Sequence, residues 1–305
     1  MQLIESIAYD MIYHSAPIIL CVLGGMFAYK ANVLNIALEG MMLNGAFISV
    51  LTYFFSHNLL LTVLLTVFTT LLYGLAFSFL GITMKGNVIV IGLAINMVST
   101  AIAGFVLVLM DSSNIILPDF DLNRLKINIP FIEGIPILGK ILSGHPFITY
   151  LSFLMIFAMY ILMYRTKFGV YVRVVGENEE AARSIGINAA FYKYAAVLIG
   201  AVGCALGGMN LSYERLGLFT NDMTAGRGFI AIAAIYCGQG KPVQSSLYAI
   251  LFGLARALSI NLSIYAGNAA GLFDCIPYIV MIVVLAAASY MKHRNIKERG
   301  FQVNE

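Results

Sequence analysis

The sequence alternates between long apolar segments and short polar connections. A helix needs about 20 apolar residues to cross a bilayer, and eight segments come close to this length. The predicted spans are Ile7–Ala28, Val33–Phe55, Leu59–Ile82, Val88–Met110, Phe147–Tyr164, Tyr194–Tyr213, Ser245–Tyr265 and Cys275–Met291. The pattern therefore predicts an all-α fold, a polytopic transmembrane helical bundle of about eight to ten helices.

One apolar segment, Gly228–Cys237, is too short to cross alone. As a helix it would be roughly 15 Å long, against a hydrocarbon core of about 30 Å. Arg227 and Lys241 flank it and oppose any extension. We expect a short half-helix buried among its neighbours, at a moving gate or at a dimer seam. The alternative is an ordinary short span in a locally thinned bilayer.

Composition agrees with a membrane protein. Of the 305 residues, 60% are hydrophobic and 11% are charged, and the mean hydropathy is +0.89. A soluble domain contains about 25% charged residues. The net charge of +3 does not indicate nucleic-acid binding, because the basic residues are scattered over short connections. We expect residues 1–305 to form a single transmembrane domain.

The connection from Arg165 to Lys193 is long and carries eight charges. Its centre predicts a short helix from Asn178 to Ile185. Asn178 can cap this helix, Glu179 and Glu180 suit its positive N-terminal end, and Gly186 can end it. One interpretation is a solvated loop helix, and the other is a peg that docks into a partner protein.

The distribution of basic residues predicts the orientation. One side of the predicted spans carries the charged connection, Lys85 and Lys241, together with the C-terminal residues Lys292, Arg294, Lys297 and Arg299. The charged connection and the C-terminus are therefore expected in the cytoplasm. Strict alternation places the N-terminus outside. If the segment from Asn32 to Gly45 bends back, or the first span does not cross cleanly, the N-terminus lies inside.

Polar residues inside the spans are candidates for a transport path, because each is costly in lipid unless it is paired or hydrated. Glu39 and Arg256 are charged and form a candidate ion pair. Asn35, Asn44, Asn96 and Asn261 can hydrogen-bond between helices, so interhelical contact is the competing interpretation. The candidate translocation residues are Asn35, Glu39, Asn44, Asn96 and Arg256.

The chain lacks the signatures of an enzyme. Gly238-Gln239-Gly240-Lys241 does not have the spacing of a phosphate-binding loop, and Pro242 follows the lysine. The four histidines are far apart, which gives no triad or metal cluster. We expect no catalysis and no cofactor in this chain, so any ATP that drives transport must bind another chain.

Three stretches together resemble a transporter family. They are ANVLNIALEGMMLNGAF (Ala31–Phe47), GENEEAARSIGI (Gly176–Ile187) and GRGFIAIAAIYCGQGKP (Gly226–Pro242). In this order and at these separations they resemble permease subunits of bacterial ABC importers of the branched-chain amino acid and simple-sugar group, and most of all its nucleoside and simple-sugar branch.

The resemblance implies partners and a role for the charged connection. The partners are two cytoplasmic ATPase subunits, a second permease subunit (a similar chain or another copy) and an extracytoplasmic solute-binding lipoprotein. The peg would be the coupling helix that fits a groove on the ATPase. Its residues would be Asn178, Glu179, Glu180, Ala181, Ala182, Arg183 and Gly186.

The expected function is import of a small polar solute by alternating access. The favoured solute is a nucleoside, followed by a ribose-like sugar and then a branched-chain amino acid. The alternative is a secondary transporter driven by an ion gradient, and a channel or scaffold is a third reading. A secondary transporter would need ion sites in both halves, and Glu39 has no clear counterpart in the second half.

Overall fold

The computed structural model describes residues 2–118, 121–128, 138–264 and 270–301 of the chain. Within these residues, eight helices are long and apolar enough to cross a membrane. They are α1 (Gln2–Lys30), α2 (Leu38–Ser56), α3 (Leu59–Ser78), α4 (Val88–Leu109), α7 (Phe147–Arg165), α10 (Ala189–Met209), α12 (Pro242–Ser263) and α14 (Ile276–Phe301). The predicted all-α membrane bundle is confirmed.

Shorter elements join these helices. The π-helical turns η1 (Phe79–Thr83) and η3 (Asn210–Glu214) prolong α3 and α10. The others are β1 (Asn114–Ile116), η2 (Leu122–Leu125), β2 (Lys126–Ile127), α6 (Leu138–Leu142), β3 (His145–Pro146), α8 (Lys167–Glu177), α9 (Glu179–Ser184), β4 (Leu218–Thr220), α11 (Arg227–Cys237) and α13 (Ala270–Phe273). Strand β1 pairs antiparallel with β4, and β2 pairs antiparallel with β3. The predicted end of the seventh span, Tyr265, lies outside the described residues.

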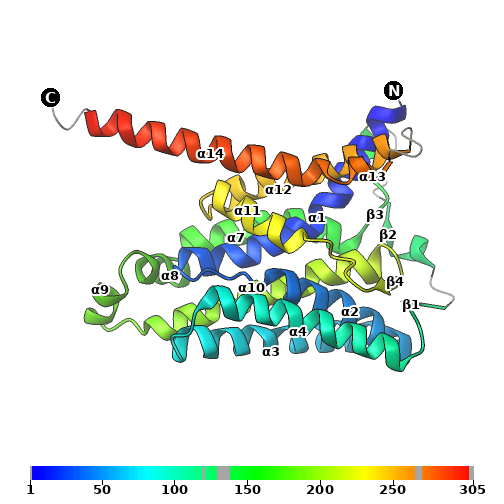
Figure 1. Cartoon of the computed structure of the whole chain (residues 1–305), viewed down its shortest axis with the longest axis horizontal. Coiled ribbons are helices and arrows are strands. Elements are labelled where there is room, and N and C mark those ends of the chain that lie inside the picture. The colour runs from blue at the N-terminus through cyan, green and yellow to red at the C-terminus, as the bar shows by residue number, and fades with distance from the viewer. Residues whose placement is uncertain (1, 119–120, 129–137, 265–269, 302–305) are drawn as a thin grey trace.

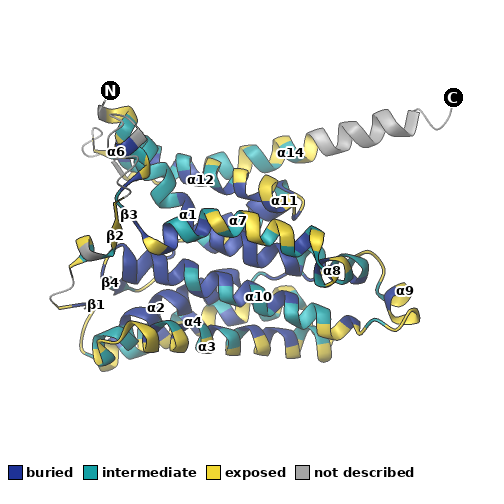
Figure 2. Cartoon of the chain, turned by 180° about the vertical axis from the view of Figure 1, so that it is seen from behind, coloured by how far each residue is buried: buried dark blue, intermediate teal, exposed yellow. Residues whose placement is uncertain are grey.

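Helix α1 forms the centre of the bundle (Figures 1 and 2). It packs against α12, α10, α7 and α11, and every residue from Ser15 to Ala28 is buried. A helix that is apolar on all sides is stable only when neighbours surround it. Its contact with α10 is very close, because a methyl group at Gly203 would lie 2.5 Å from the carbonyl oxygen of Leu20. Small residues allow such backbone approach in membranes, where van der Waals packing drives helix association.

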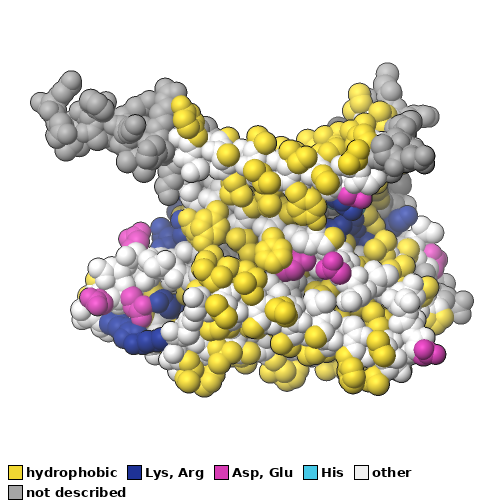
Figure 3. Space-filling model, in the orientation of Figure 1, with side chains coloured by type: hydrophobic (Ala, Val, Ile, Leu, Met, Phe, Trp, Pro, Cys, Tyr) yellow, Lys and Arg dark blue, Asp and Glu magenta, His cyan; other side chains and the backbone are white. Residues whose placement is uncertain are grey.

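The outer helices present apolar side chains to the surroundings. Phe68 on α3, Phe105 on α4, Phe157 on α7 and Ile282 on α14 are all more than half exposed. Figure 3 shows such side chains spread over the flank of the molecule. Large exposed apolar surface on several helices is the pattern expected for contact with lipid.

The second span begins with a break in the helix. A helix from Val33 was predicted, but residues 33–36 are extended and α2 starts only at Leu38. The side chain of Leu38 lies 2.7 Å from the position of a methyl group at Gly25, five residues before the end of α1. The extended segment therefore runs back into the bundle by about 8 Å.

Polar side chains make this break possible. Asn96 on α4 accepts a hydrogen bond from the backbone N–H of Gly40 at 2.7 Å and donates one to the carbonyl oxygen of Ile36 at 3.1 Å. Ser99 donates to the carbonyl oxygen of Gly40 at 2.7 Å. Irregular backbone is tolerated at membrane depth only where the protein satisfies its polar groups. The prediction of an unbroken second span failed because these partners come from a different helix.

The two ends of the bundle differ (Figures 1 and 3). Helices α8 and α9 lie at one end, where charged side chains gather. The N-terminal part of α1 lies at the other, where Lys140 contacts Glu5 at 3.1 Å and the Tyr9 hydroxyl donates to the carbonyl oxygen of Gly144 at 2.9 Å. Helix α14 runs towards the end that carries α9. The side chains of Lys292, Arg294, Lys297 and Arg299 lie outside what the structure describes.

We predict that Asn96→Leu destabilises the protein. The change removes partners from two backbone groups next to the break, and each buried group left without a partner costs about 1–3 kcal/mol. The midpoint of thermal unfolding in detergent should fall clearly. Thr100→Val is the matched control, because the Thr100 hydroxyl bonds only within its own helix, to the carbonyl oxygen of Asn96. Equal midpoints for the two variants would contradict the role given to Asn96.

Candidate functional site

Glu39, the second residue of α2, binds the first turn of α11. One carboxylate oxygen accepts a hydrogen bond from the backbone N–H of Gly226 at 2.9 Å. The other accepts one from the N–H of Gly228 at 2.5 Å. Glu39 is 8% exposed. A single buried carboxylate thus connects two chain segments that lie almost 190 residues apart.

The start of α11 is shaped to receive this carboxylate. Gly226 has a φ of +73°, a conformation that favours glycine, and a methyl group at Gly228 would lie 2.4 Å from the Cα of Glu39. The first N–H groups of a helix have no partner within the helix, and its N-terminal end carries partial positive charge. A carboxylate accepts hydrogen bonds from these N–H groups, and its negative charge interacts favourably with the positive end of the helix. Helix α11 has 11 residues and ends at Cys237, so the predicted short helix is confirmed, and its status as a half-helix stays a prediction.

The three candidate asparagines contact other parts of the protein. Asn35 accepts a hydrogen bond from the N–H of Ala37 at 3.0 Å and supports the break, as Asn96 does. Asn44 donates to the hydroxyls of Thr69 and Thr70 on α3. The interhelical interpretation therefore describes Asn44. Asn35 differs, because its buried Nδ2 has no hydrogen-bond partner within the described residues.

The candidate ion pair between Glu39 and Arg256 does not form in the structure. Arg256 on α12 lies 3.0 Å from Asp274, which directly follows α13 and was not considered. The Asp274 side chain is 64% exposed, and it lies in the candidate membrane span Gly271–Tyr290. Glu39 takes backbone N–H groups as its partners. The prediction failed because a helix N-terminus can offset a carboxylate without a basic side chain.

A second polar cluster lies at the opposite end from α9; the interhelical hydrogen bonding of Asn261 was predicted, and the part played by Asp10, His14 and Arg215 was missed. Asn261 on α12 donates to Asp10 at 2.6 Å and accepts from Ser6 at 3.0 Å, which joins α12 to α1. Arg215 lies 3.4 Å from the ring centre of Tyr13 and donates to His14 at 3.1 Å. The signal was present in the first span, where Asp10, Tyr13 and His14 follow one another at helical spacing.

Helix α9 has the predicted cap. The Asn178 side chain accepts a hydrogen bond from the N–H of Ala181 at 3.0 Å, and Gly186, with a φ of +85°, follows the helix. Ala182 is fully buried against Val175 of α8 and Ala189 of α10. Glu180 and Arg183 point away from the bundle, and Ile185 is 71% exposed. Figure 2 shows this end of the molecule as largely exposed. Helix α8, just before α9, was not predicted.

Glu179 fixes α9 to the bundle. Its carboxylate accepts hydrogen bonds from Arg183, one turn along the same helix, and from Lys193 on α10. The hydrogen bond from Lys193 is the main cause that lowers the pKa of Glu179. The stabilisation by this carboxylate is complete above its pKa in the unfolded chain and is lost as the pH falls through the lowered value. The link therefore persists at neutral pH.

Comparison with known proteins gives the family. The family model described as "Branched-chain amino acid transport system / permease component" matches residues 7–285. The guanosine ABC transporter permease protein NupQ of Bacillus subtilis is 32% identical over 293 residues, which cover 92% of this chain and 89% of that protein. The nucleoside ABC transporter permease protein NupC of Lactococcus lactis is 29% identical, with 93% and 92% covered.

The chain belongs to this permease family. The resemblance inferred from the three motifs is confirmed, and the permease component of an ABC transporter is a transport subunit. A putative glucose ABC transporter permease protein of Haloferax volcanii, TsgC13, is 28% identical to the permease, with 80% of this chain and 74% of that protein covered. No solved structure matches the chain.

We predict that Glu39→Gln loosens α11 in the permease. The amide offers one acceptor oxygen, its NH₂ group confronts the second N–H, and the charge at the helix end disappears. A hydrogen bond to a charged group contributes about 1.5–3 kcal/mol. Amide hydrogen exchange at the start of α11 should become faster, and the thermal midpoint should fall.

Asp222→Asn is the control for this substitution. Asp222 is an exposed acid in the loop that leads into α11, so its change removes the same charge without touching the Glu39 contacts. Unchanged hydrogen exchange in Glu39→Gln, or the same acceleration in Asp222→Asn, would show that Glu39 does not hold the helix.

Proposed function

We propose that the permease imports a nucleoside as the membrane-spanning subunit of an ATP-driven ABC importer. The observation that carries the proposal is the match to two permeases named for guanosine and nucleoside transport, over about nine tenths of both chains. The whole of residues 1–305 would act as one permease domain. A simple sugar is the second candidate solute, supported by the similarity to TsgC13.

In this proposal the end that carries α9 faces the cytoplasm. Lys30, Arg165, Lys167, Arg173, Arg183, Lys193 and Lys241 lie at or near that end by sequence position and by the course of the helices. Basic residues accumulate on the cytoplasmic side of membrane proteins. Because α14 runs towards this end, the C-terminus would be cytoplasmic, and the start of α1 would be extracytoplasmic.

Helix α9 is the proposed contact with the ATPase. Asn178, Glu179, Ala181, Ala182 and Gly186 would build and anchor the helix, while Glu180 and Arg183 would meet the partner with Ile185. Buried Ala182 and the Glu179–Lys193 ion pair link α9 to α8 and α10. Movement of a docked ATPase would therefore reach α10, which packs against both α1 and α2.

The break between α1 and α2 and the start of α11 are the proposed moving parts of the path. Two helix N-termini meet there inside the bundle, and polar side chains and one carboxylate satisfy them. Discontinuous helices of this kind present backbone groups to polar solutes in transporters. Asn35, with its free buried Nδ2, is the side chain here best placed to meet a sugar hydroxyl or a base. The remaining partners would be a second permease subunit and an extracytoplasmic solute-binding lipoprotein.

The identity of the solute can be tested by measuring uptake in cells that lack the gene for the permease. Accumulation of labelled guanosine should be lost and should return with the wild-type gene, while leucine accumulation stays unchanged. Excess unlabelled ribose should not compete if nucleosides are the solute. Loss of ribose uptake alone would support the sugar reading instead. Uptake that survives ATP depletion but stops when an ionophore collapses the ion gradients would contradict an ABC importer.

We predict that Ile185→Asp and Glu180→Lys each weaken binding of the ATPase. Both change exposed side chains of α9 and leave the Glu179 bridges intact, whereas a substitution of Glu179 would also release the helix from α10. Co-purification with the ATPase and ATP-dependent uptake should fall together, with normal insertion into the membrane.

Lys167→Glu is the control for the α9 variants. It reverses an exposed charge at the same end of the bundle, outside α9. Normal co-purification of both α9 variants, or equal loss with Lys167→Glu, would count against α9 as the docking element.

A further inference from the structure

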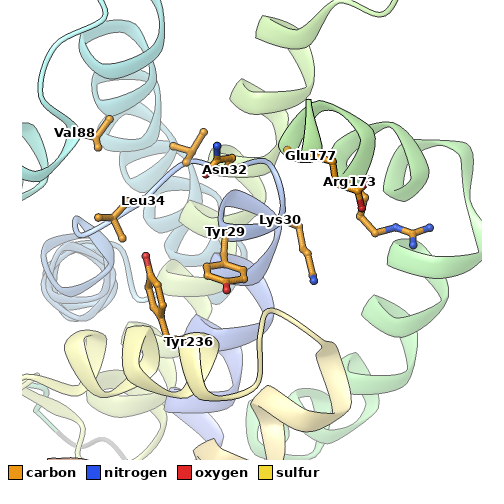
Figure 4. A pocket seen from close by; sticks show the side chains of 10 residues that line it. Tyr29, Lys30, Asn32, Leu34, Val88, Arg173, Glu177 and Tyr236 are labelled. Atoms are coloured by element: carbon orange, nitrogen blue, oxygen red, sulfur yellow. The ribbon is translucent and has the colours of Figure 1, made fainter. Parts of the chain in front are cut away.

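A cavity of about 450 Å³ opens at the end of the bundle that carries α8 and α9. Four parts of the chain form its wall: the last turn of α1, the extended segment before α2, the start of α4, and α8. Tyr236 near the end of α11 completes the wall. Figure 4 shows Tyr29 and Tyr236 at its centre, and their ring centres lie 5.0 Å apart. None of the residues proposed for docking to the ATPase lines this cavity.

Positive charge concentrates on one wall. Lys30 and Arg173 line the cavity from α1 and α8. Lys241 lies beside it, since a methyl group at the preceding residue, Gly240, would be 3.2 Å from the Cε of Lys30. Glu177 is the acidic residue of the lining.

These three cations have no ion-pair partner within the described part of the chain. The Arg173 guanidinium instead lies over the ring of Tyr164, at 5.1 Å from its centre. Glu177 of the lining offsets part of the charge of the three cations, and three cations with one carboxylate leave a net charge of +2 (+3 − 1), which costs free energy unless a further anion is nearby. The arrangement therefore suits a negatively charged ligand.

The opposite wall is apolar. Leu34 and Val88 lie on the other side of the cavity from Lys30, Arg173 and Glu177 (Figure 4). Val88 begins α4, and the next two residues, Ile89 and Val90, are 44% and 61% exposed. The apolar wall thus continues onto the outer surface of a membrane-spanning helix. A ligand that fits both walls has an anionic group joined to an apolar part.

We propose that this cavity binds the phosphate headgroup of an anionic phospholipid. The phosphate would lie between Lys30 and Arg173, with Asn32 and the tyrosine hydroxyls within reach of the glycerol. The acyl chains would leave along Val88 towards α4. The cavity lies where α1 ends and α4 begins, which is the level of the lipid headgroups. Tyrosine rings favour this level, and basic pockets between membrane helices bind phospholipid headgroups there.

Binding would join four elements at one place. The last turn of α1, the extended segment, α8 and α11 all touch the cavity, and α8 continues directly into α9. An anionic lipid would therefore hold the helix break, the half-helix and the proposed coupling end together. The proposal concerns the lipid and is independent of the solute that the permease carries.

Titration of the purified, full-length permease with lipid tests the proposal. Detergent-solubilised protein is mixed with phosphatidylglycerol or with phosphatidylcholine, and native mass spectrometry and thermal unfolding report binding. Wild type should bind phosphatidylglycerol more tightly and gain a higher unfolding midpoint from it. A basic residue near a membrane contributes about a fivefold change in binding, so Lys30→Gln combined with Arg173→Gln should weaken it about 25-fold.

Two further variants make the result specific. Lys241→Gln changes a charge beside the cavity without altering its lining and should show a smaller loss, which keeps the test valid if the double variant folds poorly. Lys167→Gln removes an exposed cation outside the cavity and should bind as wild type does. Equal binding of the two lipids, or equal binding by wild type and the Lys30 and Arg173 double variant, would overturn the proposal.

Inorganic phosphate, tested in the same way without lipid, separates the two sources of the anion. Stabilisation by millimolar phosphate that the double variant loses, with no preference for phosphatidylglycerol, would assign the site to a soluble phosphate and overturn the lipid. The cavity would instead belong to an acidic segment of the ATPase if the double variant lost the ATPase and kept its lipid binding. That result would also overturn the proposal.

Discussion

The structure depends on satisfying backbone N–H groups that begin helices inside the bundle. Helices α2 and α11 both start inside the bundle, where Leu38, Glu39 and Gly228 are buried. Glu39 supplies two acceptor oxygens to α11, and Asn96 supplies one to α2. Without them the two helix starts would be unpaired in a medium that offers no substitute. Because both segments pack against α1, the geometry of the bundle's centre follows from these few hydrogen bonds.

The polar residues of the chain therefore fall into groups with different structural roles. Glu39, Asn35, Asn96 and Ser99 support interrupted backbone inside the bundle. Asp10, Asn261, Arg215 and His14 join α1 to its neighbours near the end where α1 begins. Glu179 and Lys193 fix α9 at the opposite end. Two of these residues are not fully bonded within the described part of the chain: the buried Nδ2 of Asn35 and the buried Nε and Nη1 of Arg215 have no hydrogen-bond partner there.

Much of this was readable from sequence. The spans, the short α11 and the cap of α9 follow from hydrophobic length and from local capping rules, which depend on residues close together in the chain. The partner of Glu39, the partner of Arg256 and the break before Leu38 did not follow. Each depends on contacts between segments that are far apart in the sequence. Apolar periodicity does not predict at which level along the bundle axis two such segments meet. Helix α8 was missed because its charges resemble those of a loop.

The burial of α1 has a consequence for how the chain is made. Helix α1 is synthesised before α12, one of its main neighbours, which begins more than 200 residues later. At about 5–20 residues per second this delay is roughly 10–40 s. Asn261, the hydrogen-bond partner of Asp10, is made only with α12, whereas Arg215, the partner of His14, is made before α12 begins. The final packing around α1, and the hydrogen bond that joins Asp10 to Asn261, can therefore form only after most of the chain has been made.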